Sequence, residues 1–84
     1  MKVIGYEIKN GVFKDEKSGK DVVWEKVHVY VTESISKNGE GERTQLLKCR
    51  RDKLPPQLSL IVGAIVKDIN YDVYGNIKDL ILEI

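Results

Sequence analysis

The sequence predicts an all-β domain, a small five-stranded antiparallel OB-like barrel built from hairpins. Alternating apolar and polar residues recur in segments spaced about ten residues apart, and polar stretches containing Gly or Asn-Gly separate them. No segment has a sustained helical period. The Pro55-Pro56 step between the third and fourth segments suits the five-stranded OB barrel. SH3-like barrels have a similar length and strand number and remain an alternative.

The first strand is expected over residues 2–10, where Ile4, Tyr6 and Ile8 alternate with polar or small residues. Residues 12–13 resume the apolar pattern directly after Asn10-Gly11. This dipeptide therefore predicts either a turn or a bend within one long curved strand. The polar run over residues 14–21 then predicts a hairpin loop.

The second strand, residues 22–32, organises the rest of the chain. Successive side chains of a strand point to opposite faces, so this segment divides into two rows. One row is almost entirely β-branched and apolar: Val23, Glu25, Val27, Val29 and Val31. In the other row aromatic rings alternate with groups that can carry positive charge: Val22, Trp24, Lys26, His28, Tyr30 and Thr32.

A second polar connection follows, and its Asn38-Gly39 step predicts a hairpin. Residues 43–51 are then the third strand, antiparallel to the second. Its two rows differ, with Leu47 and Cys49 on one side and Leu46, Lys48 and Arg50 on the other. The two prolines end it, because proline cannot donate to a ladder. Residues 57–62 fit either a helical turn or an extended link.

The last two strands are expected over residues 64–71 and 77–84, joined by a turn at 72–76. The irregular pattern of the first of these strands indicates a bulge or partial burial of both faces. The final strand is apolar on both sides, with Leu80, Leu82 and Ile84 in one row and Ile77 and Ile81 in the other. We therefore expect a partner subunit to cover one side, which predicts a homodimer.

Composition limits the remaining possibilities. The 84 residues, 42% hydrophobic and 32% charged, are typical of one ordinary globular domain over residues 1–84. The longest apolar run, residues 60–66, is too short to span a bilayer, and the first residues lack the features of a signal peptide. We expect a cytoplasmic protein without membrane contact. With one cysteine and one histidine, the chain predicts no disulfide, metal site or cofactor, and Cys49 is expected to be a buried, inert thiol.

The charge distribution is more informative than the formal net charge of +1. Cations gather in one stretch, opposed only by Asp52, whereas the balance turns acidic from Leu54 onward. This stretch contains Arg43, Lys48, Arg50, Arg51 and Lys53. It predicts a weakly polarised surface that can face phosphates.

Rings that stack on bases, interleaved with cations that neutralise phosphates, are typical of single-stranded nucleic-acid binders. We therefore expect a sequence-tolerant protein that coats and protects single-stranded DNA during replication or transfer. The candidate residues are Trp24, Lys26, His28 and Tyr30, with Lys48 and Arg50 on the neighbouring strand and Arg43 or Arg51 at its ends. The alternatives are single-stranded RNA as ligand, or a protein-interaction or assembly module in which the aromatic row is an interface. For Trp24 itself, the structural alternative is a core tryptophan that seals one end of the barrel.

An enzyme is not expected. The sequence has no carboxylate pair in a Gly-framed loop, no phosphate-cradling glycine motif and no nucleophile with an evident base.

Several short motifs support the DNA-binding interpretation by resemblance. They are Gly19-Lys20 before the second strand, Tyr30 late in it, Leu47-Lys48 in the third strand, Gly63 before the fourth, and Tyr74-Gly75 before a final strand rich in Leu and Ile. In these the chain resembles the OB-fold single-stranded DNA-binding proteins of filamentous phages, typified by the gene V protein. The resemblance implies a two-fold dimer that coats single strands cooperatively. It also implies that Lys48 contacts phosphate and that Tyr74 stacks on a base. The chain departs from the family at Val22, where the family has a stacking tyrosine, and Trp24 follows one outward position later.

Overall fold

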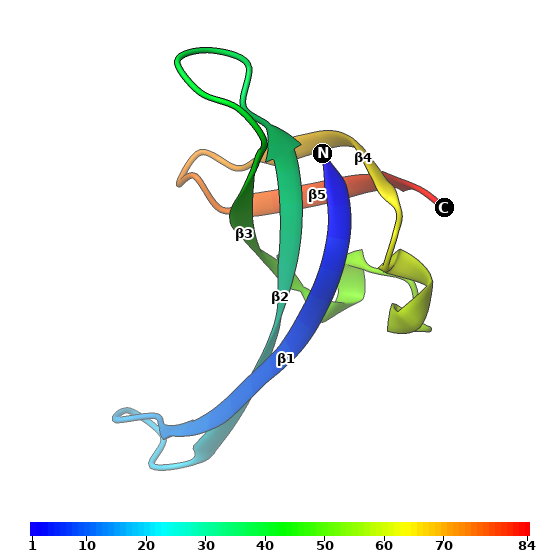
Figure 1. The fold of residues 1–84 in the computed structure, drawn as a ribbon. Helices are drawn as coiled ribbons and strands as arrows, with labels where there is room; N and C mark the ends of the chain where they lie inside the picture. The colour runs from blue at the N-terminus through cyan, green and yellow to red at the C-terminus, as the bar shows by residue number, and fades with distance from the viewer.

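The computed structural model describes residues 1–84 and contains one antiparallel sheet of five strands in the order β3-β2-β1-β4-β5 (Figure 1). The strands are β1 (Lys2–Lys14), β2 (Asp21–Ser34), β3 (Glu42–Arg50), β4 (Ile65–Tyr71) and β5 (Ile77–Glu83). Two short 3-10 helices, η1 (Arg51–Lys53) and η2 (Leu58–Ile61), connect β3 to β4. No helix has the length and apolar character needed to cross a bilayer. The predicted all-β class is confirmed.

The sheet curls but does not close. Its edge strands β3 and β5 lie close together, yet no ladder of hydrogen bonds joins them. The OB-like strand pattern therefore has an open seam between β3 and β5, and full closure into a barrel stays a prediction. The seam leaves the outward edge of β3 without a neighbouring strand.

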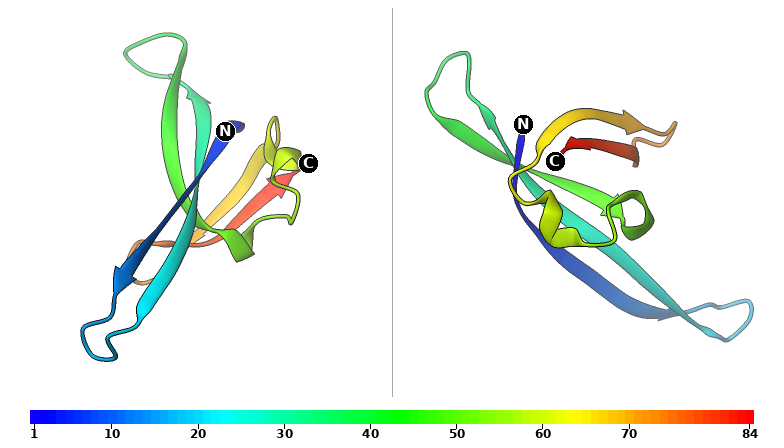
Figure 2. Two further views of the ribbon diagram at one scale, coloured as in Figure 1. Left: turned by 90° about the horizontal axis from the view of Figure 1, so that it is seen from below. Right: turned by 90° about the vertical axis from the view of Figure 1, so that its right-hand side faces the viewer.

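The hairpin of β1 and β2 is the longest feature of the molecule, with strands of 13 and 14 residues. Its register runs without interruption from Gly5 opposite Tyr30 to Lys14 opposite Asp21. The sequence alternative of a turn at Asn10-Gly11 is thus wrong, and one long strand is right. Figures 1 and 2 show the far half of this hairpin extending away from the rest of the chain. In this half Val23, which belongs to the apolar row of β2, is 75% exposed.

The core lies on one face of the sheet. The alternation predicted for the second strand is observed, because Val27, Val29 and Val31 are completely buried. Leu47 and Cys49 extend this apolar layer from β3, as predicted, and further buried side chains come from the β3–β4 connection and the flanking strands: Val3, Leu54, Leu58, Ile61, Ala64 and Leu80. The helical alternative for residues 57–62 is therefore the correct one, since η2 supplies part of the core.

The pair β4–β5 has the irregularity that the sequence predicts. Register shifts interrupt it between Val66 and Asp68 and again next to Tyr71. In β5, Leu80 is buried and Leu82 packs against the core, whereas Ile81 on the opposite side is exposed. The two predicted rows are only partly right, because Ile77 packs against the core and Ile84 is 69% exposed. The side of β5 that carries Ile81 is thus partly uncovered in the single chain, and the homodimer stays a prediction.

Candidate nucleic-acid interface

The candidate site is the outer face, defined as the surface of β1, β2 and β3 that points away from the core. Because the valines of β2 are buried, the residues between them must point to this opposite surface. Trp24 is accordingly 40% exposed and lies outside the core. The alternative of a core tryptophan is therefore wrong.

The indole of Trp24 rests on the backbone of the neighbouring strand. Trp24 lies directly opposite Gly11 in the β1–β2 ladder. A Cβ atom at Gly11 would lie only 2.7 Å from the indole atoms Cε2 and Cζ2. Glycine at this position permits the close approach of ring and backbone. The ring is thus supported on one side and accessible to solvent elsewhere.

Lysine and arginine side chains, together with His28, gather beside this ring because the strand register aligns them. Lys26 of β2 lies opposite Lys9 of β1 and opposite Arg50 of β3, and His28 lies opposite Lys48. Like charges directly opposite each other repel, so the arrangement destabilises the sheet unless an anion is nearby. We call these residues the cationic cluster: Lys9, Lys26, His28, Lys48 and Arg50.

Two carboxylates lie next to this cluster: Glu7, which is opposite His28 in the β1–β2 ladder, and Asp52. Lys9 contacts Glu7 at 3.2 Å and Arg50 contacts Asp52 at 3.1 Å, in both cases between exposed side chains. Exposed ion pairs contribute little free energy and are readily exchanged for another anion. Lys26 and Lys48, at the centre, form no ion pair.

A shallow hollow of about 550 Å³ joins the ring to the cations. Trp24 and four members of the cluster line it: Lys9, Lys26, His28 and Lys48. Lys9 is a member of this group that the sequence pattern alone does not indicate. Lys9 lies opposite Lys26 because β1 continues without a break through Gly11. The sequence would predict this pairing only if Gly11 were known to continue the strand.

Tyr30 and Glu7 mark the boundary of the hollow. The Tyr30 hydroxyl donates a hydrogen bond to Glu7 Oε1 at 3.1 Å. Hydrogen bonding by Lys9, and then by Tyr30, lowers the pKa of Glu7, while the same bond to the carboxylate raises the pKa of Tyr30. At neutral pH a carboxylate therefore holds the half-buried Tyr30 ring in a fixed orientation.

Three other predicted residues lie apart from the cluster. Arg43 is paired with Glu33 at 2.7 Å, far along the β2–β3 hairpin. Arg51 belongs to η1, and its guanidinium donates to the carbonyl of Pro55 at 2.9 Å and to that of Pro56, so it secures the diproline connection. Tyr74 occupies the β4–β5 turn and is 86% exposed. The structure thus assigns Arg51 a contact that the sequence pattern did not indicate.

Cys49 is buried, as the sequence predicts, with its side chain in the core layer. Burial raises the pKa of its thiol to about 11. The thiol is therefore protonated at neutral pH and is a poor nucleophile.

The outer face brings together most of the residues that the sequence selects: Trp24, Lys26, His28, Tyr30, Lys48 and Arg50. Chemically, it offers the Trp24 ring held against Gly11, the Tyr30 ring bonded to Glu7, and two lysines, Lys26 and Lys48, that form no ion pair. No protein-family model, no curated protein and no solved structure matches this chain.

Proposed function

We propose that this protein binds single-stranded DNA through the outer face, without strong sequence preference, and coats it. The observation that carries the proposal is the exposed Trp24 ring beside the unpaired Lys26 and Lys48. A base stacked on an aromatic ring contributes about 1–3 kcal/mol, whichever base it is. Cations at the ring's margin neutralise the phosphates that flank that base.

The same geometry favours single strands over duplexes. In a duplex the faces of the bases stack on one another, so a ring cannot reach them. The outer face also lies along strands of a sheet and has no helix that could enter a major groove. We therefore expect duplex DNA to bind through its phosphates alone, and more weakly.

Salt dependence provides a quantitative expectation. If the four strong bases of the cluster, Lys9, Lys26, Lys48 and Arg50, each neutralise one phosphate, the logarithm of the affinity falls with the logarithm of salt concentration with a slope of about −3. A ligand held by stacking alone has almost no such slope.

The test is a titration of the protein with a thymidine oligomer, followed by the emission of Trp24, the only tryptophan. We expect the emission to be quenched, and a labelled oligomer to gain fluorescence anisotropy over the same concentrations. A duplex of the same length and a uridine oligomer are the comparison ligands. Tighter binding of the uridine oligomer would favour RNA. Unchanged emission and anisotropy with all three ligands would contradict the proposal and favour a protein-interaction module.

We also propose a homodimer, on a different observation. Ile65 of β4 and Ile81 of β5 are exposed on the outward side of the sheet, away from the cationic cluster. Burying them against a second copy removes apolar surface from water, at about 25 cal/mol per Å². Light scattering at micromolar concentration tests this, and a monomer mass would contradict it.

A further inference from the structure

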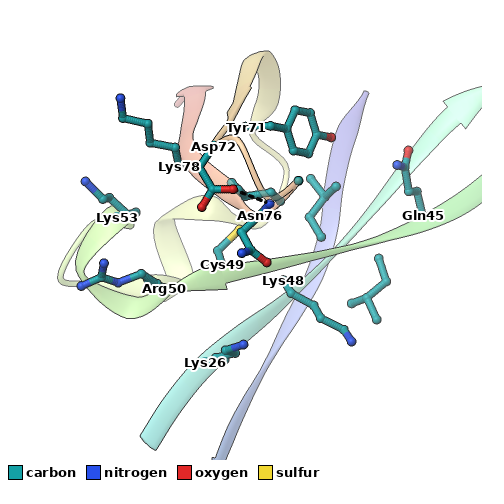
Figure 3. A pocket seen from close by; sticks show the side chains of 14 residues that line it. Lys26, Gln45, Lys48, Cys49, Arg50, Lys53, Tyr71, Asp72, Asn76 and Lys78 are labelled. Atoms are coloured by element: carbon teal, nitrogen blue, oxygen red, sulfur yellow. Dashed lines mark hydrogen bonds between the residues drawn. The ribbon is translucent and has the colours of Figure 1, made fainter.

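The open seam of the sheet forms a second, larger hollow. This edge cleft, of about 750 Å³, lies between β3 on one side and the β4–β5 turn with the start of β5 on the other. Figure 3 shows Lys26 and Lys48 below the ribbon of β3 in that view, and Lys53, Lys78 and Tyr71 above it. The cleft therefore extends around the edge of the sheet.

The lining of the edge cleft is strongly cationic. Lys53 of η1 and Lys78 of β5 contribute to it in addition to Lys26, Lys48 and Arg50. Lys78 forms no ion pair, and the distance from Lys53 Nζ to Asp79 Oδ1 is long, at 3.9 Å.

The only carboxylate in the lining, that of Asp72, accepts hydrogen bonds from the backbone. Asp72 Oδ1 accepts the backbone N–H groups of Tyr74 and Asn76, each at 2.9 Å, and so stabilises the β4–β5 turn. The lining thus carries more cations than carboxylates. Arg50 and Lys53 have the nearby carboxylates of Asp52 and Asp79, whereas Lys26, Lys48 and Lys78 form no ion pair.

The edge cleft also offers groups that recognise bases. Tyr71, at the end of β4, is 54% exposed and lines the cleft. The outward N–H and C=O groups of β3 have no ladder partner, because β3 pairs only with β2. Such groups can bond to a peptide strand as well as to bases and sugars, but the charge of the lining selects a polyanion.

The two hollows are neighbours, since Lys26 and Lys48 line both of them. We infer that a bound single strand does not end on the outer face but crosses the edge of β3 into the edge cleft. There Lys53 and Lys78 contact phosphates and Tyr71 stacks on a base. This inference rests on the proposed function and adds a second binding segment to it.

The test compares oligomers of two lengths, because only a long strand reaches both hollows. Thymidine oligomers of about 4 and about 16 nucleotides cover the range of site sizes known for OB folds. The variant is Lys53→Gln combined with Lys78→Gln. The matched control is Lys67→Gln, since Lys67 is an exposed β4 lysine paired with Glu83 and lines neither hollow.

For the long oligomer, the double variant is expected to reduce the salt slope by about 1.4, which is two contacts of about 0.7 each. Between 50 and 200 mM salt, the wild type should then lose about sevenfold more affinity than the variant. The short oligomer should bind the variant as it binds the wild type and the control. Tyr71→Ala should weaken binding of the long oligomer alone.

Two results would overturn this path of the strand. One is a double variant that binds the long oligomer with the same slope as Lys67→Gln. The other is an equal loss for both lengths, which would indicate general attraction by charge. Failure of the wild type to bind either oligomer would refute the proposed function itself. Both lysines are exposed, and circular dichroism with Lys78→Gln alone provides a check that folding is intact.

Discussion

Replacing Gly11 by alanine changes the position of the Trp24 indole without altering the indole itself. The new Cβ would lie 2.7 Å from ring atoms, whereas ordinary contacts begin near 3.4 Å, so the ring must move by about 0.7 Å. The ring is on the surface, and it can move outward. Alanine is also about 0.5–1 kcal/mol more favourable than glycine within a strand, so we expect the variant to remain folded.

We expect Gly11→Ala to weaken binding of a thymidine oligomer by about fivefold or more. This corresponds to loss of about 1 kcal/mol or more from a stacking contact of about 1–3 kcal/mol. The dissociation constant is measured by anisotropy of a labelled oligomer, and the emission maximum of Trp24 reports the displacement of the ring. A red shift is expected as the ring gains exposure.

Gly5→Ala is the matched control. Gly5 lies in the same strand, opposite Tyr30, and an added Cβ there meets no atom within 4 Å. It should bind as the wild type does. If Gly11→Ala also binds as the wild type does while its emission shifts, the supported position of the ring is irrelevant to binding, and the reasoning is refuted.

Three further predictions concern single side chains. Trp24→Ala should weaken oligomer binding several-fold with an unchanged melting temperature, because the indole lies outside the core, and a large drop in that temperature would contradict its placement. Lys48→Ala should reduce the salt slope by about 0.7, and an identical slope would remove Lys48 from the phosphate contacts. Arg51→Ala should lower the free energy of unfolding by about 1–3 kcal/mol, because its bonds to the diproline carbonyls are lost, and it should have little effect on binding. Chemical denaturation and oligomer titration measure the two effects. Unchanged stability with weaker binding would show that Arg51 contacts DNA.

The local pattern was sufficient to predict the strands and the division of β2 into two rows. Alternation is a property of a few neighbouring residues, and a buried row of valines requires that Trp24 and Lys26 point the other way. The same logic predicted the bulge in β4 and the burial of Cys49.

Features that depend on distant segments were not predictable in this way. Lys9 joins the cluster because β1 continues through Gly11, and a glycine before a resumed strand pattern is also compatible with a turn. Lys53 and Lys78 line the same cleft only because the curl of the sheet brings β5 close to β3 and η1. Arg51 belongs to a basic run in the sequence, which suggests a phosphate contact. In the structure its guanidinium instead donates to the carbonyls of Pro55 and Pro56.

The far half of the β1–β2 hairpin has a dynamic consequence. The ladder between β2 and β3 ends where Lys26 lies opposite Arg50. Trp24 and Gly11 lie just beyond this point, where the sheet has only two strands. Two strands alone are marginally stable in water. Amide protons near Trp24 should therefore exchange with deuterium faster than those near Val29, and the difference should narrow when an oligomer is bound. Trp24 therefore lies in the part of the sheet with the fewest neighbouring strands, and slower exchange there on addition of an oligomer would show that the ligand orders it.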